Sequence, residues 1–297
     1  TIWYPTVLTF GAVSFAYIGL NGASDAVLAS NKIFTLVTVL AIYWAATFIA
    51  MKGIGWVGKI SKWGGLIGTI IPAGLLIVLG IIYIATGGHN YMDMSQSFIP
   101  DLTKFDNLVL ASSIFLFYAG MEMMGVHVMD VNNPSRNYPK AIIIGSLATV
   151  CIFVLGTFAL GVIIPAKDIN LTQSLLIGFD NFFRYFHIPW AGPVIAVALM
   201  LGVLASVLTW VAGPSKGIFT VGKAGYLPPF FQKSNSHGVQ RNILLVQGGI
   251  VTLLSLLFVV MPSVQSFYQI LSQLTILLYL IMYMLMFAAA ITLRYKI

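Results

Sequence analysis

The sequence predicts an all-α polytopic membrane protein, and three observations lead to that prediction. Of the 297 residues, 59% are hydrophobic and 8% are charged, whereas a soluble domain carries about 25% charged residues. The apolar residues form runs long enough to cross the hydrocarbon core, which takes about 20 residues of helix. Helices are expected because lipid does not tolerate unpaired backbone groups, and because porin strands are short and alternate in polarity.

The chain divides into eight apolar segments, each expected to form one membrane-spanning helix. Their approximate limits are residues 2–20, 33–51, 64–86, 107–128, 140–164, 190–213, 242–261 and 267–293. The connection at residues 165–189 is long, which suggests a short helix on the outer surface. Both ends of the chain lie directly on a span, so we expect a piece of a longer protein.

Basic residues are distributed unequally between the two sets of loops. The side reached after the second span receives 11 of the 15 Lys and Arg residues, and six of the seven aspartates lie on the other side. Because cytoplasmic loops are enriched in Lys and Arg, the first side is predicted to be cytoplasmic. This asymmetry explains the net charge of +7, so nucleic acid is not expected as a partner.

The only glutamate of the chain, Glu122, falls inside the fourth apolar segment. An ionisable side chain at this depth costs about 2.5–3.5 kcal/mol on insertion scales, so its first interpretation is functional. The alternative is a buried Glu that joins two helices by hydrogen bonds. Gly120 and Gly125 interrupt the same segment. They indicate either a broken helix that exposes backbone groups to a ligand or close helix packing.

Other kinds of site have little support in the residues. The single cysteine, Cys151, and four scattered histidines show no metal-ligand spacing. There is no P-loop motif, and no cofactor is expected. A channel would need a continuous polar stripe and a membrane-embedded enzyme a cluster of reactive side chains at one face, so both are minor alternatives.

Two motifs resemble the amino acid/polyamine/organocation (APC) superfamily of permeases. Residues 117–122, Phe-Tyr-Ala-Gly-Met-Glu, are similar to the aromatic–Gly–x–Glu run of that family's sixth helix. A turn from Asp130 to Pro139 follows, with the family's Asn-Pro and second proline. Residues 212–217, Ala-Gly-Pro-Ser-Lys-Gly, resemble the end of the eighth helix, in the form closest to the glutamate/GABA antiporter branch. The resemblance covers essentially the whole chain.

The resemblance implies a fold and a function. The fold is the APC-type inverted-repeat transporter fold (5+5), truncated at both ends, with the eight spans as helices three to ten of twelve. Residues 1–106 would hold the last three helices of the first repeat and residues 107–297 the five helices of the second. The implied function is not enzymatic: it is alternating-access transport of an amino acid across the cytoplasmic (inner) membrane. A glutamate/GABA-like antiporter is the leading interpretation, and a symporter or uniporter of neutral or cationic amino acids is the alternative.

The resemblance also implies which residues meet the substrate. The expected substrate-binding residues are Phe117, Tyr118, Ala119, Gly120, Glu122, Ser206 and Trp210. The first four would line an unwound turn with their backbone, and Glu122 would close hydrogen bonds around it. Ser206 and Trp210 are four residues apart and share one helical face. Ordinary aromatic packing for Phe117 and Tyr118 and an interfacial anchor role for Trp210 remain alternatives.

Proton transfer or pH sensing is expected at Glu122 and His127, although His127 also suits a simple polar helix end.

The chain departs from its relatives at three positions. Some amino acid antiporters have a Trp gate where this chain has Leu116, and the glutamate/GABA antiporters have an acid where it has Ser206. Proton- or sodium-coupled relatives place a Lys near the position of Gly68. Exchange or uniport is therefore favoured over Lys-mediated symport.

Overall fold

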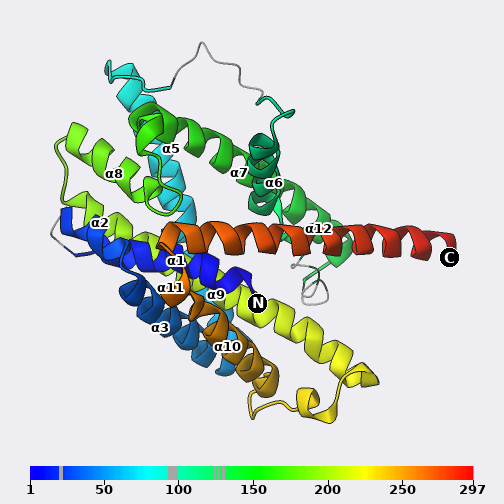
Figure 1. Cartoon of the computed structure of the whole chain (residues 1–297). Helices are drawn as coiled ribbons and strands as arrows, with labels where there is room; N and C mark the ends of the chain where they lie inside the picture. Colours follow the sequence, from blue (N-terminus) through cyan, green and yellow to red (C-terminus); the bar gives the residue numbers. More distant parts are fainter. Residues whose placement is uncertain (20–22, 93–99, 123–124, 126–127, 129–130, 297) are drawn as a thin grey trace.

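A computed structural model describes residues 1–19, 23–92, 100–122, 125, 128 and 131–296, and these ranges are helical with no β-strand. Figure 1 shows the helices in chain order, with α12 extending away from the other helices toward the C-terminus. The α-helices are α1 (Trp3–Ala16), α2 (Ala23–Ala29), α3 (Lys32–Met51), α4 (Ile54–Gly65), α5 (Ile71–Ala85), α6 (Phe105–Tyr118), α7 (Pro134–Ile163), α8 (Ser174–Tyr185), α9 (Ala191–Val221), α10 (Arg241–Ser255), α11 (Leu257–Val260) and α12 (Val264–Lys296). Short 3-10 and π-helical turns connect several of them.

Six helices in the described ranges are long and apolar enough to cross a membrane. They are Lys32–Met51, Gly55–Ala85, Pro134–Ile163, Ala191–Tyr226, Arg241–Val260 and Val264–Tyr295. The remaining two predicted spans, α1 and α6, are helical but have 14 residues each. At 1.5 Å per residue each is about 21 Å long, less than the roughly 30 Å hydrocarbon core. The chain is therefore a multi-pass membrane protein whose eight predicted segments all contain helix.

Two of the predicted boundaries are wrong for identifiable reasons. The third span was expected to begin at residue 64, but its helix begins at Ile54. Lys59 and Lys62 are exposed on α4, so their charge marks the end of the apolar run and not the end of the helix. Residues 134–139 were expected in a turn, but they form the start of α7. A proline at the first helical position, here Pro134, sacrifices no hydrogen bond.

One further expectation is confirmed, and one further boundary is wrong. The helix expected between residues 165 and 189 is confirmed as α8. The fourth span was expected to run from 107 to 128, but α6 ends at Tyr118. Asp130, expected to open the turn before the fifth span, lies outside the described residues.

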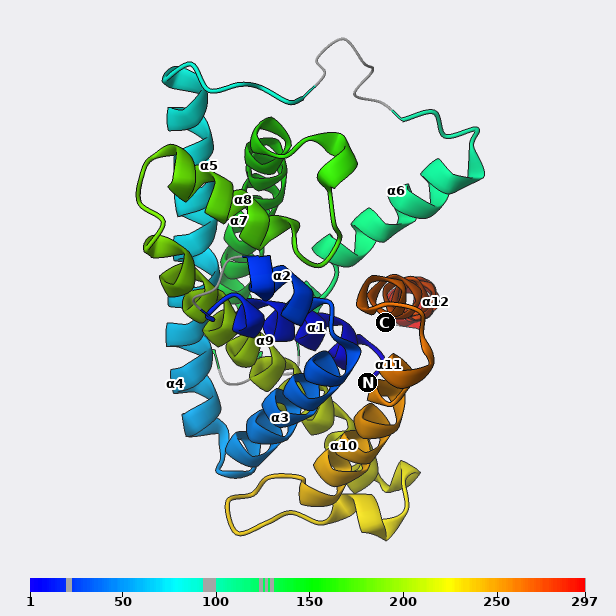
Figure 2. The same cartoon turned by 60° about the vertical axis from the view of Figure 1, so that its left-hand side comes forward.

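α4 and α5 form one long rod, joined by a π-helical turn at Leu66–Ile70; α4 and the turn pack on α9, and α5 packs mainly on α7. The rod is the long vertical helix in Figure 2. Gly68, inside the π turn, meets Gly202 of α9 so closely that a Cβ on Gly68 would overlap the Gly202 backbone. One turn earlier, a Cβ on Gly64 would lie 2.5 Å from that of Ala205. Glycine therefore lets the two helices touch backbone to backbone, as small residues do in membrane helix pairs.

Two apolar cores meet at α9. The first joins α1, α3, α9, α10 and the start of α12 around Tyr43, Leu208 and Phe267. The second joins α5, α7, α8 and the N-terminal half of α9 around Phe179 and Phe182. Because α9 contributes to both cores, it is fixed along most of its length. Side chains on its free face consequently have a rigid support.

Candidate functional site

The helix of the fourth span is broken at Ala119 and Gly120. α6 ends at Tyr118, Ala119 is extended with φ −75° and ψ 154°, and Gly120 has φ 110°. A φ of this value is readily adopted only by glycine. This end of α6 agrees with the broken-helix alternative, which stays a prediction because most of residues 123–130 lie outside the described ranges. The break leaves backbone groups near residues 116–120 without their helical partners.

Glu122 lies just after the break and closes hydrogen bonds around it, as expected. Its Oε2 accepts a hydrogen bond from the backbone N–H of Gly120 at 3.0 Å and from the hydroxyl of Tyr283 at 2.9 Å. The Gly120 N–H also lies 3.4 Å from that hydroxyl oxygen. The second carboxyl oxygen, Oε1, is buried and has no hydrogen-bond partner among the described residues.

Trp210 connects the break to α9 and α1. A Cβ placed on Gly120 would lie 2.7 Å from Cζ2 of the Trp210 ring, so the indole packs directly on the glycine. The centroid of the same ring is 5.0 Å from that of Trp3. These contacts place Trp210 beside the broken helix, which does not favour the interfacial-anchor alternative.

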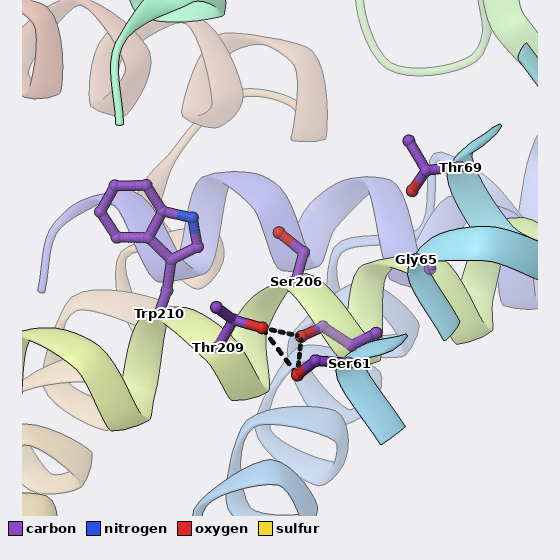
Figure 3. Close-up of a pocket in the computed structure, with 8 residues that line it drawn as sticks. Ser61, Gly65, Thr69, Ser206, Thr209 and Trp210 are labelled. Carbon is purple, nitrogen blue, oxygen red and sulfur yellow. Dashed lines mark hydrogen bonds between the residues drawn. The ribbon is translucent and has the colours of Figure 1, made fainter. Parts of the chain in front are cut away.

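A cavity of about 220 Å³ lies next to Trp210, between α4 and α9 (Figure 3), and its lining contains several hydroxyl groups. It is lined by Ser61, Gly65, Thr69, Gly202, Ala205, Ser206, Thr209 and Trp210. Its volume is below the roughly 300–1,000 Å³ of pockets for drug-sized ligands. The cavity therefore suits a small metabolite.

Hydroxyl groups dominate the polar lining of this cavity. Thr209 Oγ1 lies 2.7 Å from Ser61 Oγ and 2.9 Å from the carbonyl oxygen of Ala205, and the Ser61 hydroxyl donates to the same carbonyl at 3.4 Å. The Ser206 hydroxyl points away from this pair in Figure 3 and makes no hydrogen bond to any described residue. It is available to a ligand. None of the lining side chains carries a charge.

The structure brings together five of the seven predicted substrate-binding residues. Ala119, Gly120, Glu122 and Trp210 surround the break, and Ser206 lines the adjoining cavity with Trp210. The Tyr118 ring packs on Phe153 of α7 with centroids 5.6 Å apart, which supports the packing alternative for that side chain. The side chain of Phe117 and the whole of His127 lie outside the described residues.

Four polar residues of the site were not predicted: Ser61, Thr69, Thr209 and Tyr283. Tyr283 bonds Glu122 from a position 161 residues away, and no local pattern identifies such a partner. Tyr279 and Tyr283 are four residues apart, so they share one face of α12, and this spacing is a usable signal. Ser61 was missed because the third span was expected to begin after it, at residue 64. No three His, Cys, Asp or Glu side chains of the described residues gather where they could hold a metal.

Comparisons with known proteins agree with this architecture. A family model described as amino acid permease matches residues 1–296. An uncharacterized transporter of Legionella pneumophila is 35% identical over 295 residues, which cover 99% of this chain and 62% of that protein. A glutamate/gamma-aminobutyrate antiporter of Lactococcus lactis is 32% identical over 303 residues, with 99% and 60% covered. A putrescine transporter, PotE, of Escherichia coli is 25% identical over 263 residues, with 86% and 56% covered. The chain spans about three fifths of the length of these relatives.

Proposed function

The chain belongs to the amino acid permease family, and from this premise we propose that the protein exchanges amino acids across the cytoplasmic membrane by alternating access. The observation that carries the proposal is the break at Ala119–Gly120, bounded by Glu122 and Trp210 and adjoining a cavity. Transporters built from broken helices hold substrate where the unwound backbone meets polar side chains. In this proposal residues 107–297 form one inverted repeat, and residues 1–106 belong to the other.

The cavity favours a substrate without net charge. Its lining offers hydroxyl groups, backbone and an indole but no charged side chain, and burying an unpaired charge costs several kcal/mol. A zwitterion such as GABA meets this condition directly. Glutamate meets it when its side-chain carboxyl is protonated, a form about 100 times more abundant at pH 5.5 than at pH 7.5, given a pKa of about 4.3. Glutamate transport is therefore expected to be faster at acid pH.

Glu122 is the proposed group that senses substrate or protons. It is a carboxyl group inside the protein with one oxygen committed to Gly120 and Tyr283 and the other without a partner among the described residues. A proton or a substrate ammonium at the free oxygen would change the charge beside the break. Because the same side chain holds the Gly120 N–H, that change acts directly on the unwound turn.

Counterflow in proteoliposomes tests the proposal. Vesicles are loaded with one unlabelled amino acid or amine, and uptake of labelled glutamate, GABA or a neutral amino acid is followed at pH 5.5 and 7.5. Glutamate uptake driven by internal GABA, and strongest at pH 5.5, supports the glutamate/GABA antiporter. If the folded protein exchanges no amino acid at all, the transporter proposal is wrong.

Ser206 supports a second candidate, an exchanger or uniporter of neutral or cationic amino acids. The resemblance to the glutamate/GABA antiporters implies an acid at this position, whereas this chain has a hydroxyl group there that lines the cavity. Uptake limited to neutral or cationic amino acids would favour this candidate and discard the glutamate/GABA assignment. Uptake that needs no internal amino acid would identify uniport.

A further inference from the structure

The backbone carbonyl of Trp210 has lost its helical hydrogen bond. Pro214 lies inside α9, four residues after Trp210, and proline has no N–H to donate to the carbonyl four residues before it. In a membrane protein such a carbonyl must find another donor, because water is scarce. The donor is the hydroxyl of Tyr4 in α1, at 2.7 Å. Tyr4 is 2% exposed and lies 206 residues away in the sequence.

The next carbonyl, that of Val211, also accepts a hydrogen bond from a side chain. The Ser215 hydroxyl donates to the carbonyl of Val211, and it accepts a hydrogen bond at 2.7 Å from the side-chain amide of Gln240. Gln240 is buried and adjoins the start of α10. Side chains from α1 and from the residue before α10 thus bond to this part of α9. The Tyr4 bond is part of this arrangement and is not an isolated contact.

The residue held by Tyr4 is the one that shapes the site. The Trp210 ring packs on Gly120 at the break and lines the cavity with Ser206. Trp3, the neighbour of Tyr4 in α1, meets the same ring with centroids 5.0 Å apart. Two adjacent residues of α1 therefore hold the backbone and the side chain of Trp210.

We propose that Tyr4 is a positioning residue for Trp210, and that its hydroxyl replaces the N–H that Pro214 removes. The bond sets how far the indole reaches toward Gly120 and so fixes the width of the substrate cavity at that end. The effect on transport rests on the proposed function, whereas the effect on the indole does not. A displaced indole changes substrate affinity first, because it alters the cavity without touching Glu122.

The test is a double-mutant cycle with Tyr4→Phe and Pro214→Ala. The protein is labelled with 5-fluorotryptophan in nanodiscs, and the Trp210 fluorine resonance is assigned by its absence in Trp210→Phe. Tyr4→Phe is expected to shift or broaden this resonance and to raise KM in counterflow about tenfold with a smaller change in kcat. In the double variant, Pro214→Ala restores a backbone N–H that can donate to the Trp210 carbonyl. The Trp210 fluorine resonance and the KM of the double variant should therefore be close to those of Pro214→Ala alone.

Tyr43→Phe is the matched control. Tyr43 is fully buried, its ring lies 5.4 Å from that of Tyr4, and its hydroxyl has no hydrogen-bond partner among the described residues. Its removal should leave the Trp210 resonance and KM unchanged. A Tyr4→Phe variant that behaves like this control, or a double variant as impaired as Tyr4→Phe, overturns the proposal.

Two further outcomes keep the test decisive. If Tyr4→Phe alone does not fold, the Pro214→Ala variant is compared with the double variant. The loss of the Tyr4 hydroxyl must then leave the Trp210 resonance and KM unchanged. A marked change in either refutes the proposal that the Tyr4 hydroxyl replaces the missing N–H. If the resonance follows the cycle but the wild-type protein exchanges no amino acid, the positioning role stands and the proposed transport function fails.

Discussion

Replacing Gly120 with alanine tests whether the broken helix requires its observed geometry. The φ of 110° at Gly120 belongs to a region that alanine adopts at a cost of about 1–3 kcal/mol. The added Cβ would also lie 2.7 Å from Cζ2 of Trp210. Since carbon atoms prefer a separation of about 3.5–4.0 Å, the ring would have to retreat by about 1 Å.

Trp210 has little freedom to retreat. Its ring already meets Trp3, and its carbonyl is bonded to Tyr4. The backbone strain and about 1 kcal/mol for the disturbed contacts together raise the free energy of this conformation by about 2–4 kcal/mol. If the conformation lies on the transport cycle, the exchange rate should fall by about 30- to 1,000-fold.

Initial counterflow rates and the melting temperature would both be measured for Gly120→Ala. Gly125→Ala is the control from the same segment, since its Cβ would make an ordinary contact at 3.7 Å with the Tyr138 hydroxyl. It should change the rate by less than about twofold. Wild-type transport and melting in Gly120→Ala would show that the break does not need this backbone conformation.

Three further substitutions test other parts of the site. Glu122→Gln keeps an acceptor for its two donors but removes the charge, so exchange should fall by about tenfold or more, as measured by counterflow; unchanged exchange would remove Glu122 from the mechanism. Tyr283→Phe deletes one donor to that carboxylate and should cost about 1.5–3 kcal/mol, seen as a lower melting temperature; a wild-type melting curve argues against the bond. Gly68→Ala forces a methyl group into the backbone of α9 and should lower the melting temperature sharply, whereas Gly74→Ala, with open space around it, should not; equal melting temperatures would contradict the close contact.

Features that depend on local sequence could be predicted, and those that depend on distant partners could not. Apolar run length located all eight helical segments, and Gly120 beside Glu122 identified the break as one of two alternatives. Charge at Lys59 and Lys62 gave the wrong start for α4, because a helix can continue beyond the hydrocarbon core. That error hid Ser61, which lies on the α9 side of the added turns.

Long-range partners have no comparable signature in one sequence. Tyr283 bonds Glu122 across 161 residues, and Tyr4 bonds Trp210 across 206. Pro214 does predict that the Trp210 carbonyl lacks a helical donor. Only the fold shows that the donor is Tyr4.

The π-helical turn at Leu66–Ile70 affects how the sequences of relatives align with this chain. A π turn holds one residue more than the corresponding α-helical turn, so the two arms of the rod are out of step by one position. In a sequence alignment with relatives, α4 with Ser61 and α5 with Leu76 must therefore be aligned separately. A relative with a regular helix here is expected to show a one-residue gap inside the turn, where Gly68 lies. Any residue equated with Gly68 by counting from one end alone would be displaced by about 100° around the helix axis.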